Sequence, residues 1–141
     1  MPAVSIVTGT YNSEAFLGNY FRMLDQQTFS DWEAVLVDDG SSDGTAEKVR
    51  AKARTDPRYR LLEKRREGLP SRSRAVGLGA TCGKYAAFCD HDDLWAPRKL
   101  ELQVHLLESL PGIAILHTDR VIWRQLEFPP VMTCFDGSAA A

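Results

Sequence analysis

Residues 33–45 read EAVLVDDGSSDGT, and this stretch decides the fold. The strand that it predicts at 33–38 is apolar on both faces, as in strands buried inside parallel sheets. The Asp, Ser and Gly residues that follow stop a strand and cap a helix. A buried strand also meets a turn near residue 9, and another runs into the sequence DHDD at 90–93. The chain is therefore expected to alternate strands and helices.

The remaining apolar segments complete this alternation. Strands are expected at 3–8, 33–38, 59–63, 85–89 and 113–117, and helices at 13–27, after the DDGSSDGT loop, at 71–80 and after Pro97. This order predicts an α/β fold, with a mainly parallel Rossmann-like sheet and helices on both faces. We expect one domain over 1–119 and an irregular C-terminal tail over 120–141.

Composition limits the possible classes of protein. The chain has 141 residues, 44% of them hydrophobic, and a net charge of −2, so it can bury a core without metal or disulfide support. Cys82, Cys89 and Cys134 form an odd set without CxxC spacing, which favours a reducing compartment. The sequence shows neither a signal peptide nor a transmembrane stretch, so we expect a cytoplasmic protein.

Charge is unevenly distributed along the chain. Residues 48–74 carry 11 basic and three acidic side chains, so an anion could bind there, or the helical part could simply be a solvated basic face. Nucleic acid is not an expected partner, because this segment has no interleaved aromatics beyond Tyr59 and no zinc or helix-turn-helix pattern.

Five carboxylates follow two of the expected strands: Asp38, Asp39, Asp90, Asp92 and Asp93. The carboxyl ends of parallel strands meet at one edge of a sheet, where ligands bind in open α/β folds. Clustered carboxylates favour a hard divalent cation, Mg²⁺ or Mn²⁺, which would serve a phosphate-bearing ligand. The alternative is that they are strand-end caps and solvated loop acids.

Three short motifs fail on inspection. Gly77, Gly79 and Gly83 nearly spell a dinucleotide fingerprint, but they precede a strand, which indicates tight packing and a turn instead. No P-loop sequence occurs. Read as a calcium loop, the segment that begins at Asp90 has Trp95 where Gly is needed.

Four segments taken together do match one family: VSIVTGTYN, VLVDDGSSDGT, SRSRAVGLG and KYAAFCDHDDLWAPRKLELQ. They closely resemble the nucleotide-binding half of family 2 glycosyltransferases with the GT-A fold, over about residues 4–119. The resemblance implies transfer of a sugar from a nucleoside-diphosphate sugar, most simply a UDP-sugar, to a carbohydrate or lipid-linked acceptor. It also implies that the transfer inverts the anomeric configuration of the sugar, requires a divalent cation and takes place at the inner face of a membrane.

The resemblance also implies roles for individual residues in nucleotide binding. The donor nucleotide would contact Thr10, Tyr11, Asp38, Asp39, Ser41, Arg74, Asp90 and His91. Tyr11 would pack on the base and Asp39 would accept a hydrogen bond from it, while Asp38 and Ser41 shape the loop. Gly9 stands where the family usually has Pro.

The phosphate and metal roles follow in the same way. Arg74, with Arg72 as second candidate, would neutralise the diphosphate, and Ala75 replaces the family's usual Asn. In the DxD motif Asp92 would bind the metal, and Asp90 would contact ribose or a metal-bound water. Asp93 is a candidate second-layer group. Trp95 either contacts the donor or only packs.

An inverting transfer also needs a general base. The resemblance implies that this base and much of the acceptor site lie in a second half of the domain, which we expect to be missing, and Asp119 is the nearest remaining acid. The chain could therefore be a non-catalytic nucleotide-sugar-binding module that acts as a homodimer or through a partner chain. A phosphohydrolase with Asp90 as nucleophile is disfavoured, since its motif would open the domain.

Overall fold

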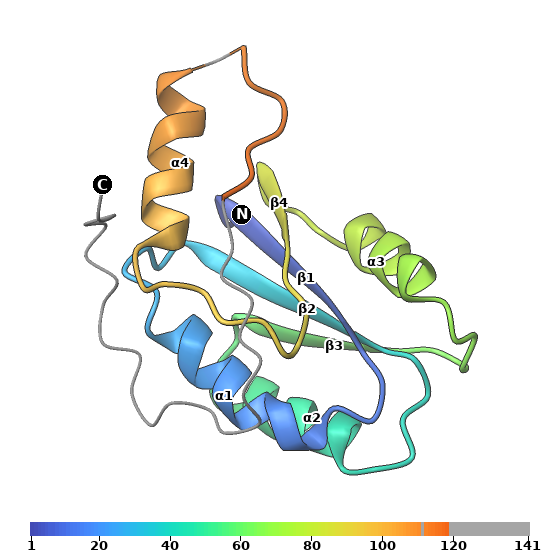
Figure 1. The fold of residues 1–141 in the computed structure, drawn as a ribbon. Coiled ribbons are helices and arrows are strands. Elements are labelled where there is room, and N and C mark those ends of the chain that lie inside the picture. The colour runs from blue at the N-terminus through green and yellow to red at the C-terminus, as the bar shows by residue number, and fades with distance from the viewer. Residues whose placement is uncertain (111, 119–141) are drawn as a thin grey trace, which may run out of the picture.

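The computed structural model describes residues 1–110 and 112–118 and contains a four-stranded sheet with order β3-β2-β1-β4 (Figure 1). The strands are β1 (Val4–Thr10), β2 (Trp32–Asp38), β3 (Tyr59–Glu63) and β4 (Tyr85–Phe88). The helices are α1 (Glu14–Asp25), α2 (Thr45–Thr55), α3 (Pro70–Gly79) and α4 (Lys99–Ser109). Every neighbouring pair of strands is parallel. All the carboxyl ends therefore lie at one edge of the sheet, as the sequence predicted.

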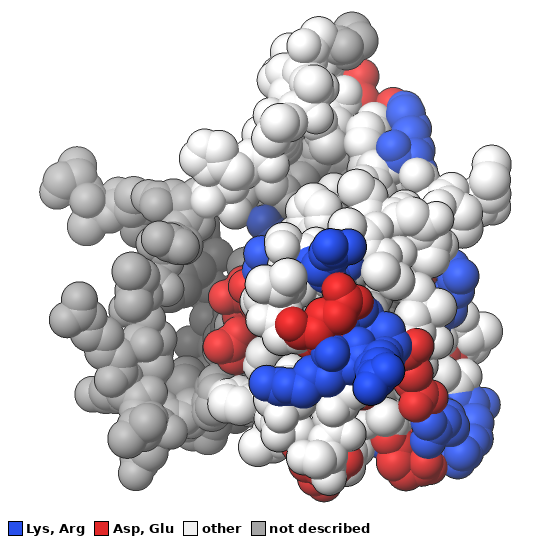
Figure 2. All heavy atoms as spheres, turned by 90° about the vertical axis from the view of Figure 1, so that its right-hand side faces the viewer, with Lys and Arg blue, Asp and Glu red and all other residues white. Residues whose placement is uncertain are grey.

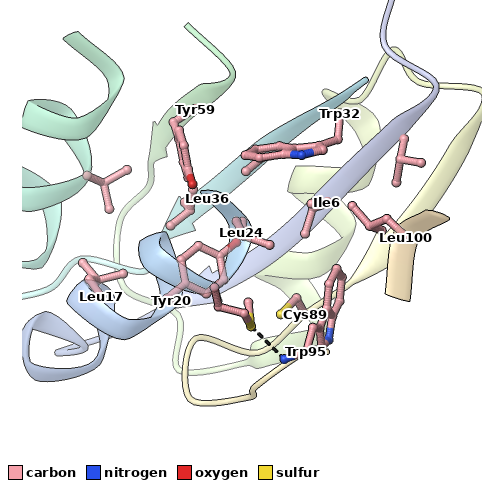
Figure 3. Packing of buried hydrophobic residues seen from close by; sticks show 14 residues of the cluster. Ile6, Leu17, Tyr20, Leu24, Trp32, Leu36, Tyr59, Cys89, Trp95 and Leu100 are labelled. Carbon is pink, nitrogen blue, oxygen red and sulfur yellow. Dashed lines mark hydrogen bonds between the residues drawn. The ribbon is translucent and has the colours of Figure 1, made fainter. Parts of the chain in front are cut away.

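One face of the sheet carries the main hydrophobic core. Side chains from α1, α2 and α4 pack there against alternate residues of β1 and β2, among them Ile6 and Leu36 (Figure 3). The Thr8 hydroxyl and the Tyr20 phenol form a hydrogen bond of 2.7 Å inside this core. The helix at 14–25 is thus held to the strand that leads into the carboxyl edge.

The other face is covered by α3, which lies very close to the strands. A Cβ built on Gly77 would stand 2.5 Å from Cγ1 of Val7 and 3.1 Å from Cγ2 of Val37. Only glycine allows this approach, so Gly77 is a packing residue and not part of a dinucleotide loop, as the sequence indicated. The expectation of helices on both faces is confirmed (Figure 1).

The loop after β4 is fastened to the core through Trp95. The Trp95 side chain is buried, and its backbone N–H donates to Sδ of Met23 at 2.9 Å, the dashed line in Figure 3. Of the two roles considered for Trp95, the structure shows packing. Pro97 lies just before α4 in the same loop, and its carbonyl accepts the N–H of Thr28 at 2.9 Å.

The strand expected at 113–117 is wrong. These residues form no ladder, and Ile115 is 85% exposed. Leu116 instead lines a small groove with Leu100 and Val104 of α4, so the apolar pattern reflects side-chain packing without strand pairing. Asp119 and the expected tail at 120–141 lie outside the described residues. In the described part of the chain, no helix has the length and apolar composition that crossing a membrane requires.

Candidate functional site

A cleft of about 180 Å³ opens at the carboxyl edge of the sheet. It is lined by Gly9, Thr10, Tyr11, Asp39, Arg66, Gly68, Pro70, Ser73, Arg74 and Asp90. These residues come from the end of β1, the loops after β2 and β4, the β3–α3 connection and α3. Figure 2 views the molecule from the side toward which the strand ends point, and basic side chains gather there with acidic ones among them. The cleft thus combines an aromatic ring with charges of both signs.

Asp38 lies beside the cleft and organises the loop after β2. Its carboxylate accepts the backbone N–H of Ser41 at 2.9 Å and also the Ser41 hydroxyl. The Thr10 hydroxyl donates to the same carboxylate at 3.3 Å. Asp38 is 3% exposed, so the structure places it with Ser41 as a group that shapes the loop rather than one that lines the cleft.

A second set of bonds joins this loop to the turn after β1. Asn12 has a φ of 47°, a left-handed conformation that Asn tolerates better than most residues. Its backbone N–H donates to the Ser41 hydroxyl at 2.9 Å, and its Oδ1 accepts the N–H of Ser42 at 2.9 Å. Tyr11, which precedes it, is therefore held at the edge of the cleft.

Of the two carboxylates that follow β2, Asp39 is the one that lines the cleft, and three donors already engage it. Lys64 Nζ and the N–H of Glu67 donate to Oδ1, and the N–H of Gly68 donates to Oδ2 at 2.8 Å. The hydrogen bond from Lys64, helped by the two amides, holds the pKa of Asp39 below its usual value although burial opposes this. Because a carboxylate offers about four acceptor positions, Asp39 keeps about one for a further donor.

Arg74 and Asp90 form an ion pair that lines the cleft. The Arg74 Nη2 lies 2.6 Å from Asp90 Oδ1, and both side chains are about half exposed. Arg72, the second phosphate candidate, is exposed, reaches Glu67 at 3.7 Å and does not line the cleft. The structure therefore separates the two arginines and brings only Arg74 into the site.

The residues that follow Asp90 in the DxD segment do not line the cleft. The His91 ring packs edge-on against Phe16, with 5.5 Å between ring centroids. Asp92 and Asp93 are exposed, and the N–H of Asp93 donates to the Asp90 carbonyl at 3.1 Å. Burial raises the pKa of the Cys89 thiol, with the carboxylates of Asp93 and Asp90 adding to the effect, so this thiol is unreactive.

A metal ion bound at Asp90 and Asp92 would need further ligands besides side chains of the protein. Within residues 1–110 and 112–118, no group of three or more His, Cys, Asp or Glu side chains is placed to hold one. Asp90 and Asp92 nevertheless supply the oxygen donors that Mg²⁺ and Mn²⁺ prefer, and both are open to solvent. Mg²⁺ is usually bound by one or two carboxylates, with phosphate oxygens and water as its other ligands. Asp90 and Asp92 therefore fit a metal ion that binds together with a phosphate-bearing ligand.

Sequence reasoning missed Lys64 and Arg66. Both lie in the β3–α3 connection, and from sequence they were recognised only as two of the 11 basic residues of segment 48–74. Most of the other basic side chains in this run belong to α2 and its surroundings and make ion pairs, such as Arg50 with Glu63 at 2.6 Å. The α2 part is thus a paired, solvated helix face. Beside the cleft, Lys64 and Arg74 make ion pairs with Asp39 and Asp90, and the Arg66 guanidinium lies over the Tyr11 ring.

Comparison with known proteins points to one family. A family model described as "Glycosyl transferase family 2" matches residues 5–135. The UDP-Glc:alpha-D-GlcNAc-diphosphoundecaprenol beta-1,3-glucosyltransferase WfgD of Escherichia coli is 34% identical over 104 residues, which cover 74% of this chain and 40% of that protein.

Solved structures give the same result. S. aureus TarS 1–349 in complex with UDP-GlcNAc has a TM-score of 0.66 and 28% identity, over 75% of this chain and 31% of TarS. The mannosyltransferase PcManGT from Pyrobaculum calidifontis, in complex with GDP-Man and Mn²⁺, has a TM-score of 0.69 and 28% identity, over 75% and 32% of the two chains. The chain spans less than half the length of each of these relatives.

Proposed function

The chain belongs to glycosyl transferase family 2, and from this premise we propose that its cleft binds the nucleoside diphosphate of a sugar donor, with a UDP-sugar preferred. The observation that carries the proposal is that one cleft contains an aromatic ring, a carboxylate with a remaining acceptor position, and an Arg–Asp pair. A nucleotide presents a flat base, ring N–H donors and phosphate oxygens. Each of these features has a counterpart among the lining residues.

The base would lie between the end of β1 and the β3–α3 connection. Tyr11 offers a ring for stacking, and Asp39 offers its remaining acceptor position to the N–H of a pyrimidine. Thr10, Asp38 and Ser41 would act indirectly, because their mutual hydrogen bonds fix the two loops. The UDP-GlcNAc bound to TarS and the GDP-Man bound to the mannosyltransferase support a nucleotide-sugar ligand.

The diphosphate would take the place of Asp90 beside Arg74. A guanidinium binds two phosphate oxygens with its planar fork, and releasing the exposed pair costs little. Asp92, with Asp90, would hold a divalent cation, and His91 would border the donor. When bound, such a cation stabilises the negative charge that develops on the departing nucleoside diphosphate.

For the whole protein we propose transfer of the sugar, with inversion, to a carbohydrate or lipid-linked acceptor at the inner face of a membrane. The name of WfgD, which specifies a diphosphoundecaprenol-linked acceptor, supports the lipid-linked class. The general base that an inverting transfer needs is not assigned to any residue in the described part of the chain.

Calorimetric titration of the 141-residue chain with UDP, GDP and dTDP, with and without Mn²⁺, tests the donor site. We expect UDP to bind best and to bind more tightly with Mn²⁺. Asp92→Asn should remove the effect of Mn²⁺, while Glu47→Gln, which changes an exposed carboxylate on α2, should not. Binding that is the same with and without Mn²⁺ would contradict the metal role, and binding of none of the three nucleotides would contradict the site.

A further inference from the structure

The guanidinium of Arg66 covers one face of the Tyr11 ring. Its Cζ lies 3.5 Å from the ring centroid, well within the range of a cation–π contact. Both side chains line the cleft. A base that stacks on this face of Tyr11 must therefore displace the guanidinium.

The backbone of Arg66 is fixed. The two residues that follow it, Glu67 and Gly68, donate their N–H groups to Asp39, and the φ of 71° at Gly68 sets the turn. A Cβ built on Gly40 would lie 3.0 Å from the Arg66 nitrogen, so the loop after β2 packs directly on this residue. Asp39 thus also fixes the position of the Arg66 backbone.

The side chain of Arg66, in contrast, is free to move. Arg66 is exposed, and its guanidinium lies over the Tyr11 ring without forming a hydrogen bond or ion pair in the described part of the chain. Lys64 is held by Asp39, and Arg74 is held by Asp90. Arg66 is the cleft-lining arginine that can swing outward without breaking an ion pair.

We propose that Arg66 is a movable clamp for the nucleobase of the donor. The guanidinium swings away from Tyr11 when the nucleotide enters and closes on the base, so that the base lies between the Tyr11 ring and the guanidinium. The inference rests on the proposed function, because it assigns Arg66 to the nucleotide site. Stacking on aromatic and guanidinium groups changes affinity by at least about fivefold per base.

The test compares UDP affinities of the wild type, Arg66→Ala, Arg66→Lys and the control Arg65→Ala at several salt concentrations. Arg65 is the adjacent exposed arginine, does not line the cleft, and its loss changes the charge equally. A clamp predicts that both Arg66 variants bind UDP about tenfold more weakly, since an ammonium cannot stack as a plane. It also predicts an unchanged salt dependence and an unchanged Arg65→Ala affinity.

Three outcomes would overturn the clamp while leaving the donor site intact. Arg66→Ala could bind UDP as tightly as the wild type. Arg66→Lys could restore binding, which would indicate a charge effect. A flatter salt dependence in Arg66→Ala would indicate a screened phosphate contact. Failure of the wild type to bind UDP, GDP or dTDP would instead contradict the proposed function itself.

Discussion

Replacing Gly77 by Ala should destabilise the domain and weaken nucleotide binding together. The new Cβ would lie 2.5 Å from Cγ1 of Val7, which is buried on a central strand and stiff about χ1. Overpacking of this kind costs about 3 kcal/mol. The better helix propensity of alanine returns about 1 kcal/mol. The net loss of unfolding free energy should be about 2 kcal/mol.

Urea unfolding measures this loss directly, and Gly79→Ala is the matched control. Gly79 ends the same helix and has nothing within 4 Å of a built Cβ, so alanine there should change stability by no more than about 1 kcal/mol, in the stabilising direction. Gly77→Ala should also lower UDP affinity, since α3 carries Ser73 and Arg74 into the cleft. Equal stabilities for the two variants would refute the close packing of α3 on the sheet.

Three further changes have defined outcomes. Burial opposes ionisation of Glu33, but hydrogen bonds from Ser5, Arg60 and Cys82 lower its pKa from 4.5 to about 2. The stability that the ionised Glu33 provides is present above pH 4.5 and is lost as the pH falls toward 2. The unfolding free energies of the wild type and Glu33→Gln should therefore differ by at most about 3 kcal/mol at pH 7 and converge in acid. Urea unfolding at pH 7, 4 and 3 measures this difference. A difference in unfolding free energy that does not change with pH would contradict the lowered pKa of Glu33. Asp39→Asn turns an amide NH₂ toward donors and should weaken UDP binding at least tenfold by calorimetry; an unchanged affinity would mean that the base lies elsewhere. Arg74→Lys should weaken UDP several-fold by losing the guanidinium fork, and equal binding would remove Arg74 from the phosphate site.

The sequence predicted the fold well because β1 and β2 are short, buried and followed by strong turn signals. The order of elements up to residue 109 and the placement of helices on both faces agree with the structure. The error at 113–117 has a physical cause, since a short apolar run packs as readily against a helix as in a ladder. Leu116 packs against α4.

The candidate site was predicted in part. Strand direction alone brings Asp39 and Asp90 to one edge, and the structure places both in the cleft. The resemblance favoured Arg74 and left Arg72 as second candidate; the residue pattern alone could not choose between them, because which one enters the cleft depends on how α3 is rotated over the sheet. Nor could it find Arg66, whose position depends on the turn at Gly68. The binding roles themselves remain predictions.

Amide chemical-shift mapping of the labelled chain with UDP and Mg²⁺ tests the central claim most directly. The account predicts shifts concentrated at the end of β1, in the loop after β2 and in the β3–α3 connection, with Gly9, Tyr11 and Gly68 among the most affected residues. Replacing Mg²⁺ with paramagnetic Mn²⁺ should broaden the amides around Asp92. Shifts that cluster on α2 or α4, or no shifts at any of the three loops, would contradict a nucleotide-sugar site in this cleft.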